Sequence, residues 1–124
     1  MLKPGGKLAF SVWQEGAPGF SVVLDAIAKH GDGNVSLPGA PLPFFHFADR
    51  KNAAGALAAA GFEASSVRHE LIPCYAPLGE PDDLFQMFAT ATARTRATLE
   101  AQTPDQLDAI RSAMRAEVEA RFAG

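Results

Sequence analysis

The sequence predicts an α+β fold with few strands and about four helices, in a single domain over residues 1–124. Three observations lead to this prediction. Two short runs are rich in β-branched and aromatic residues, several other segments repeat apolar residues at helical spacing, and strong capping signals mark helix ends. A chain of 124 residues is long enough for one domain with a sizeable core.

Two segments are predicted to be strands. The turn Pro4-Gly5-Gly6 leads into residues 7–13, a short apolar run typical of a strand buried on both faces of a parallel sheet. Residues 62–72 form the second predicted strand, in which Val67, His69 and Leu71 share one face. A buried strand needs neighbours on both sides, and little of this sequence precedes residue 7 to supply one.

Two helices are predicted in the first half of the chain. Residues 20–30 place apolar side chains at helical spacing and are followed by the loop 31–48, which is rich in Gly and Pro. Asp49 is a good N-cap for a helix that continues to residue 60, and Gly61 stands where a C-terminal glycine belongs.

The second half is predicted to be helical. One helix is expected over residues 82–101. Thr103-Pro104-Asp105-Gln106 then combines a threonine N-cap, a proline at the first position and a glutamine that completes a capping box. The helix that it starts carries one apolar face, formed by Leu107, Ile110, Met114, Val118 and Phe122.

Composition excludes several classes of protein. The apolar fraction of 48% and the charged fraction of 20% are ordinary for a soluble globular protein. The net charge of -3 argues against a nucleic-acid partner and against a polybasic membrane surface. With neither a membrane-spanning stretch nor a signal peptide, the expected location is cytoplasmic. Cys74 is the single cysteine, and the histidines lack metal-ligand spacing, so no metal site is expected.

Two motifs resemble a known family. Residues 2–8, Leu-Lys-Pro-Gly-Gly-Lys-Leu, resemble the turn into the fifth strand of class I S-adenosylmethionine-dependent methyltransferases. Asp49-Arg50, followed by Leu-Ala-Ala-Ala-Gly-Phe at residues 57–62, resembles the helix and turn before the sixth strand of these enzymes. Residues 78–122 resemble the helical insertion of the methyltransferase type 11 group.

The resemblance implies that the chain is the C-terminal part of a bacterial methyltransferase, with a Rossmann-like α/β fold of which strands one to four are missing. The full-length parent would use S-adenosylmethionine, but the Gly-rich loop that binds this cofactor is absent here. The glycines of residues 31–36 follow a predicted helix rather than a strand. We therefore expect the chain to bind no cofactor and to be inactive alone.

The expected substrate-binding residues are Trp13, Phe44, Phe45 and His46. Trp13 closes the first predicted strand, where ligands of α/β proteins bind, although it serves equally well as a core aromatic. The connection that holds Phe44, Phe45 and His46 lies over the acceptor site in the enzymes resembled. His46 is a candidate general base, and a solvent-facing histidine is its simpler interpretation. His69 is expected to be structural and Cys74 inert.

Two other interpretations stay open. The chain is alternatively a self-associating, non-catalytic binding module, in which a homodimer covers the unpaired edges of the first strand. It is also interpretable as a truncated enzyme, because Met1 directly precedes the Leu-Lys-Pro-Gly-Gly turn. The substrate class is a small molecule, and the atom that would accept the methyl group does not follow from the sequence.

Overall fold

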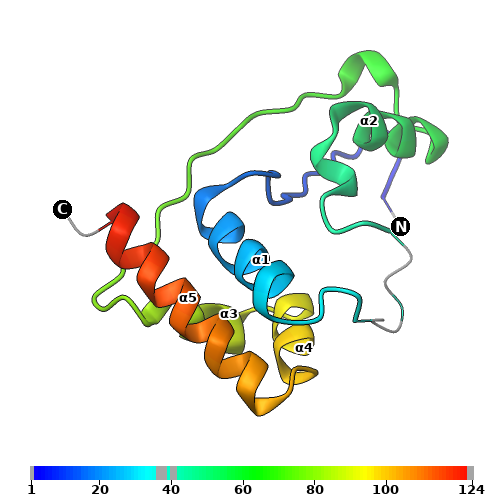
Figure 1. Ribbon diagram of the computed structural model, residues 1–124. Coiled ribbons are helices and arrows are strands. Elements are labelled where there is room, and N and C mark those ends of the chain that lie inside the picture. The colour runs from blue at the N-terminus through cyan, green and yellow to red at the C-terminus, as the bar shows by residue number, and fades with distance from the viewer. Residues whose placement is uncertain (1, 36–38, 40–41, 123–124) are drawn as a thin grey trace. The chain divides into compact units, whose positions relative to one another are not determined.

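The computed structural model describes residues 2–35, 39 and 42–122. Over these residues every regular element is a helix and there is no strand (Figure 1). The predicted fold class is therefore wrong: this part of the chain forms neither a Rossmann-like α/β fold nor an α+β fold. The chain divides into two compact units, unit 1 (Met1–Glu15 and Leu42–Leu71) and unit 2 (Gly16–Pro41 and Ile72–Gly124).

Neither predicted strand forms in the structure. Residues 6–14 and 67–78 have no regular secondary structure, and residues 64–66 of the second predicted strand form a short 3-10 helix instead. Their apolar side chains are open to solvent, as Leu8 at 52% and Leu71 at 64% exposure show. The physical reason is that strand propensity describes a fit to a sheet surface. An apolar segment becomes a strand only when neighbouring strands pair with its backbone, and the described residues supply none.

Unit 2 is built from α1 (Pro18–His30), α3 (Asp83–Ala91), α4 (Arg94–Glu100) and α5 (Pro104–Phe122). Helix α5 contacts α1 and α3, and α3 also contacts α1 and α4. The contact faces hold nearly all the buried apolar side chains of the described residues: Phe20, Val22, Val23, Ala26, Ile27, Leu84, Phe85, Phe88, Leu99, Ile110, Met114 and Val118. Full burial of one large apolar side chain contributes about 1.5–3 kcal/mol, so this core holds unit 2 together.

The core of unit 2 follows the apolar periodicity of the sequence. Helix α1 confirms the predicted helix over residues 20–30, and Phe20 meets Phe88 of α3 edge to face, with ring centroids 5.0 Å apart. On α5 the predicted apolar face buries Ile110, Met114 and Val118. The side chain of Phe122, the last residue of that predicted face, lies outside the described part.

The predicted helix over residues 82–101 is interrupted. Thr92 ends α3 with an extended backbone, at φ -119° and ψ 143°, and α4 begins two residues later at Arg94. The hydroxyls of Thr90 and Thr92 donate hydrogen bonds to carbonyl groups four residues earlier in α3. Threonine competes for helical backbone acceptors and has stiff side-chain torsions, so this threonine-rich stretch favours a break.

The predicted capping box of α5 is confirmed. The Thr103 N–H donates to Gln106 Oε1 at 3.0 Å, and the Gln106 N–H donates to Thr103 Oγ1 at 3.3 Å. Each side chain therefore satisfies a backbone N–H that has no partner within the helix. This reciprocal pair fixes where the longest helix of unit 2 begins.

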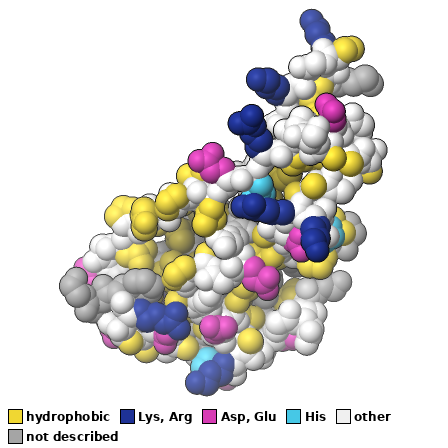
Figure 2. Space-filling model, turned by 90° about the horizontal axis from the view of Figure 1, so that it is seen from above, with side chains coloured by type: hydrophobic (Ala, Val, Ile, Leu, Met, Phe, Trp, Pro, Cys, Tyr) yellow, Lys and Arg dark blue, Asp and Glu magenta, His cyan; other side chains and the backbone are white. Residues whose placement is uncertain are grey.

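Unit 1 contains η1 (His46–Ala48), α2 (Arg50–Ala59) and η2 (Ala64–Ser66). Among its described residues only Ala53 contributes a buried apolar side chain. Eight large apolar side chains of the unit are exposed instead. They are Leu2, Leu8, Phe10, Val12, Trp13, Leu42, Phe44 and Leu71. Figure 2 shows hydrophobic side chains of the molecule that reach the surface, in yellow. Unit 1 thus buries little apolar surface of its own.

Both ends of α2 confirm the sequence prediction. Asp49 Oδ1 accepts a hydrogen bond from the Lys51 N–H at 2.7 Å, which makes Asp49 the N-cap. At the other end the Gly61 N–H donates to the Ala58 carbonyl at 3.0 Å. Gly61 has a φ of +89°, a conformation that glycine adopts without steric cost. The chain therefore leaves α2 through a glycine-dependent turn.

Candidate functional site

Five aromatic residues of unit 1 form what we call the aromatic cluster: Phe10, Phe44, Phe45, His46 and Phe47. The rings of Phe44 and Phe45 meet at 88° with centroids 4.8 Å apart, and those of His46 and Phe47 meet at 78° and 4.9 Å. Phe10 reaches Phe47 at 6.4 Å and 74°. Each contact has the edge-to-face geometry that aromatic quadrupoles favour.

Local backbone bonds hold the cluster in place. The His46 N–H donates to the Pro43 carbonyl at 3.1 Å, and the Ala48 N–H donates to the Phe45 carbonyl at 2.9 Å. The Asn52 amide of α2 donates to the His46 carbonyl at 3.0 Å, which ties η1 to the helix that follows. The proline and the tight helical turn therefore order consecutive rings on a short stretch of chain.

The structure brings three of the four predicted site residues together. Phe44 is 39% exposed, while Phe45 and His46 are half-buried beside it. Trp13, the fourth, belongs to the same unit and is 54% exposed. Phe10 and Phe47 complete the cluster, and the sequence prediction did not include Phe10. The alternation of apolar residues over 8–12 could have drawn attention to Phe10, but it was interpreted as the pattern of a buried strand.

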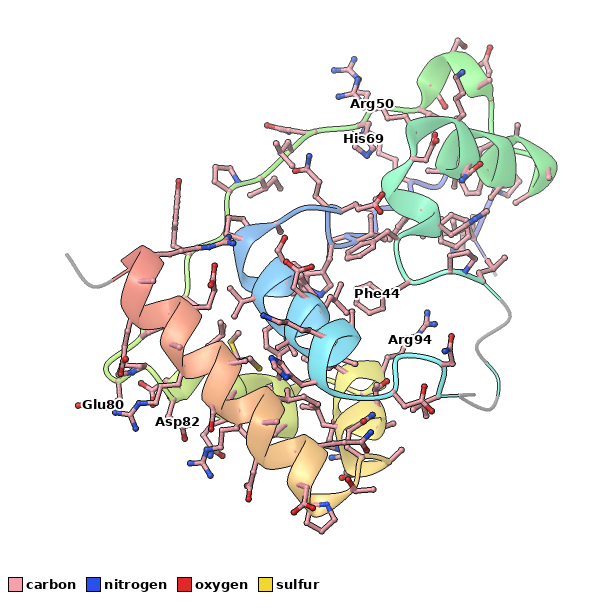
Figure 3. All side chains as sticks on the ribbon, in the orientation of Figure 1. Phe44, Arg50, His69, Glu80, Asp82 and Arg94 are labelled. Carbon is pink, nitrogen blue, oxygen red and sulfur yellow. The ribbon has the colours of Figure 1, made fainter. Side chains whose placement is uncertain are left out.

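Unit 1 also contains a side-chain hydrogen bond between two residues that lie far apart in the sequence. The Arg50 Nε–H donates to His69 Nδ1 at 3.1 Å, and Figure 3 shows the two side chains next to each other. Because Nδ1 accepts, this geometry requires a neutral imidazole with its proton on Nε2. The pair joins α2 to the segment after η2, and its 19-residue separation hides it from sequence reasoning.

Unit 2 contains a bidentate ion pair between α3 and α5. Arg111 donates from Nε to Asp82 Oδ1 at 2.7 Å and from Nη2 to Asp82 Oδ2 at 2.5 Å. These hydrogen bonds lower the pKa of Asp82 below its ordinary value, and Asp82 in turn raises the pKa of Arg111. The guanidinium also lies 5.5 Å from the Phe85 ring centroid. The pair joins the start of α3 to α5.

The glycines after α1 do not fit a cofactor-binding loop. The Asp32 N–H donates to Gln102 Oε1 at 2.7 Å, and the Asp32 carbonyl accepts from Gln102 Nε2 at 2.9 Å. The Asn34 N–H donates to Asp32 Oδ1 at 2.8 Å. Because these backbone groups are already bonded, they are not free to hold phosphate, ribose or carboxylate groups. Ser36 lies outside the described residues.

Two other features bear on possible ligands. Within the described residues no group of three or more His, Cys, Asp or Glu side chains is arranged to hold a metal ion. Cys74 is an exposed free thiol next to Tyr75, which is 92% exposed. Among the described helices, none has both the length and the apolar composition needed to cross a lipid bilayer.

Comparison with known proteins gives no relative: no family model, curated protein or solved structure matches the chain. Function is therefore inferred from the residues and their geometry.

Proposed function

We propose that the chain supplies the acceptor-side surface of an S-adenosylmethionine-dependent methyltransferase that acts on a small molecule. The observation that carries the proposal is the aromatic cluster, in which Phe10 from one segment meets Phe47 from another. The resemblance of residues 2–8 and 49–62 to motifs of that family supports the same assignment.

The cluster suits a flat, apolar acceptor that carries a hydroxyl or an amine. The half-exposed ring of Phe44 offers a surface on which a planar ligand stacks, and the ring of Phe45 meets the Phe44 ring edge to face. His46 supplies a titratable nitrogen beside the rings, and imidazole is the usual general base near neutral pH. In this proposal His46 takes the proton of the acceptor group.

The cofactor is not assigned to this chain. The glycine loop after α1 has its backbone groups engaged by Gln102 and Asp32, so it does not fit S-adenosylmethionine. In the proposal the parent enzyme binds the cofactor through other residues. Isothermal titration with S-adenosylhomocysteine is therefore expected to detect no binding. Micromolar binding would contradict this assignment of the cofactor site.

Binding of a planar probe tests the acceptor site. In amide-resolved NMR titrations, 2-naphthol is expected to shift the backbone signals of residues 44–48. Decahydro-2-naphthol, which has the same hydroxyl but no flat ring, is expected to shift them less. Phe44→Ala should weaken 2-naphthol binding by about five- to tenfold, because it removes the exposed ring on which the ligand is proposed to stack.

The matched control is Leu24→Ala on α1, since Leu24 is 40% exposed and Phe44 is 39% exposed. Its effect on binding should be negligible. The proposal fails if both variants weaken binding equally, or if 2-naphthol leaves residues 44–48 unshifted.

A second candidate function is self-association, and a specific observation favours it. Unit 1 exposes most of its large apolar side chains and buries almost none. Exposed apolar surface of this kind is common at protein interfaces. A homodimer would remove part of it from water. Sedimentation of the purified chain is expected to show a concentration-dependent dimer, and a monomer at about 100 μM would exclude this candidate.

A further inference from the structure

We infer that residues 7–15 pair with the same residues of a second copy, as two antiparallel strands centred on Ser11. This inference rests on the self-association proposed above and adds to it the segment, the register and the residues that select the partner. Binding of a methyl acceptor at the aromatic cluster does not require this pairing.

The side-chain pattern of the segment is that of a strand with one apolar face. Leu8, Phe10 and Val12 alternate along the chain, and their exposed fractions are 52%, 52% and 44%. Alternate residues of a strand lie on the same face, so these three side chains would form one apolar stripe. In the structure residues 7–12 have no regular secondary structure, and a second strand would offer hydrogen-bond partners to their backbone groups.

Charge complementarity points to a second copy as the partner. Lys7 and Glu15 are the charged residues of the segment, stand at its two ends and are both exposed. When two antiparallel copies are centred on Ser11, Lys7 of each faces Glu15 of the other. The segment is therefore complementary to itself, and the symmetric pairing gives two attractive contacts across a two-fold axis.

The same register also matches the apolar residues. With Ser11 on the axis, Phe10 faces Val12 of the other copy, an aromatic and β-branched pair that stabilises antiparallel strands. A slip by one residue would turn one apolar stripe away from the other. Centring the pair on Phe10 or on Val12 would leave Lys7 and Glu15 without each other. Ser11 is the centre that satisfies both conditions.

Cross-linking tests the register. In a Cys74→Ser background, Ser11→Cys should form a disulfide-linked dimer rapidly under mild oxidation, because the two substituted residues face each other across the axis. The matched control is Ala9→Cys. Two such residues would be displaced by about 14 Å along the strands, beyond the roughly 7 Å that a disulfide spans. The control should therefore cross-link at least tenfold more slowly.

Charge exchange tests the partner. Lys7→Glu and Glu15→Lys should each weaken dimerisation by about tenfold, because two attractive contacts become two repulsive ones. The double variant should regain the dimer, and an equimolar mixture of the single variants should form a heterodimer. The helical signal in circular dichroism should stay unchanged in every variant, since the segment lies outside the helices.

Each outcome decides the inference. Equal cross-linking of Ser11→Cys and Ala9→Cys in a dimeric protein overturns the register but leaves self-association standing. Charge variants that dimerise as strongly as the unmodified chain also overturn the register and leave self-association standing. A monomeric chain overturns both, and the exposed stripe would then belong to a different partner.

Discussion

Gln102 shows how one buried amide can order two distant parts of unit 2. Its Oε1 and Nε2 bind both backbone groups of Asp32, and Nε2 also donates to the Thr98 carbonyl at 2.8 Å. The adjacent Gly31 is required by this close approach, because a Cβ on it would lie 2.6 Å from Gln102 Oε1. The chain after α1 is therefore fastened to the end of α4 by a side chain that lies 70 residues away in the sequence.

Replacing this amide should be costly. Gln102→Leu leaves the Asp32 N–H and carbonyl without their partners in a partly buried place. We expect the free energy of unfolding to fall by about 1–3 kcal/mol, measured by urea denaturation. Gln86→Leu, at an exposed position on α3, is the control and should change stability by less than about 0.5 kcal/mol. Equal losses of stability in the two variants would show that the hydrogen bonds of Gln102 to Asp32 contribute nothing specific.

At the scale of elements, helix ends were the most predictable part of the molecule. The caps at Asp49, Gly61 and Thr103 act within a few residues, so their signals are complete in the local sequence. The break at Thr92 was missed because apolar spacing continues across it, and the backbone conformation of one threonine decides it. The strand predictions failed for a different reason, since a strand is not a local structure.

The capping box gives a test at this scale. Thr103→Ala removes the hydroxyl that accepts from the Gln106 N–H, so the first turn of α5 loses its cap. The free energy of unfolding should fall by about 1 kcal/mol in thermal or urea denaturation. Ser112→Ala in the middle of the same helix makes a matched control and should be neutral or slightly stabilising. A Thr103→Ala variant as stable as the control would refute the capping role.

For the whole molecule, the contrast between the two units is the main structural finding. Unit 2 buries apolar residues from four helices in one core, whereas Ala53 is the single buried apolar residue in the described part of unit 1. Burial of apolar surface is the main favourable term in folding. Unit 1 instead leaves large apolar side chains exposed to water. Both proposals for its function rest on that exposed apolar surface.

The ion pair across unit 2 makes its stability depend on pH. The pKa of Asp82 is lowered from 3.8 in the folded protein, chiefly by hydrogen bonds from Arg111. A lowered folded pKa stabilises the protein above the unfolded value and loses this contribution as pH falls through the folded value. Asp82→Asn should therefore lower the free energy of unfolding slightly near pH 6, and the difference should shrink below pH 4.

The control for the pH experiment is Asp25→Asn, at an exposed position on α1. Urea titrations at several pH values should show a stability difference with the stated pH dependence for Asp82→Asn alone. A difference that stays constant between pH 6 and pH 3 would exclude a contribution from ionised Asp82.

The candidate site was predictable in part. Phe44, Phe45 and His46 are neighbours in the sequence, and their grouping followed from the composition of one loop. The contact of Phe10 with Phe47 spans two segments that no local pattern connects. The hydrogen bond between Arg50 and His69 was missed for the same reason.

The sequence by itself determined the caps of α2 and α5 and the apolar faces of the helices in unit 2, because capping and periodicity act over a few residues. Only the tertiary structure decided that the strand-like segments form no sheet among the described residues. It also decided that Gln102 holds a loop seventy residues away, and that the aromatic rings of unit 1 stay half-exposed. Strand pairing and burial depend on which segments meet in space, and that choice belongs to the fold as a whole.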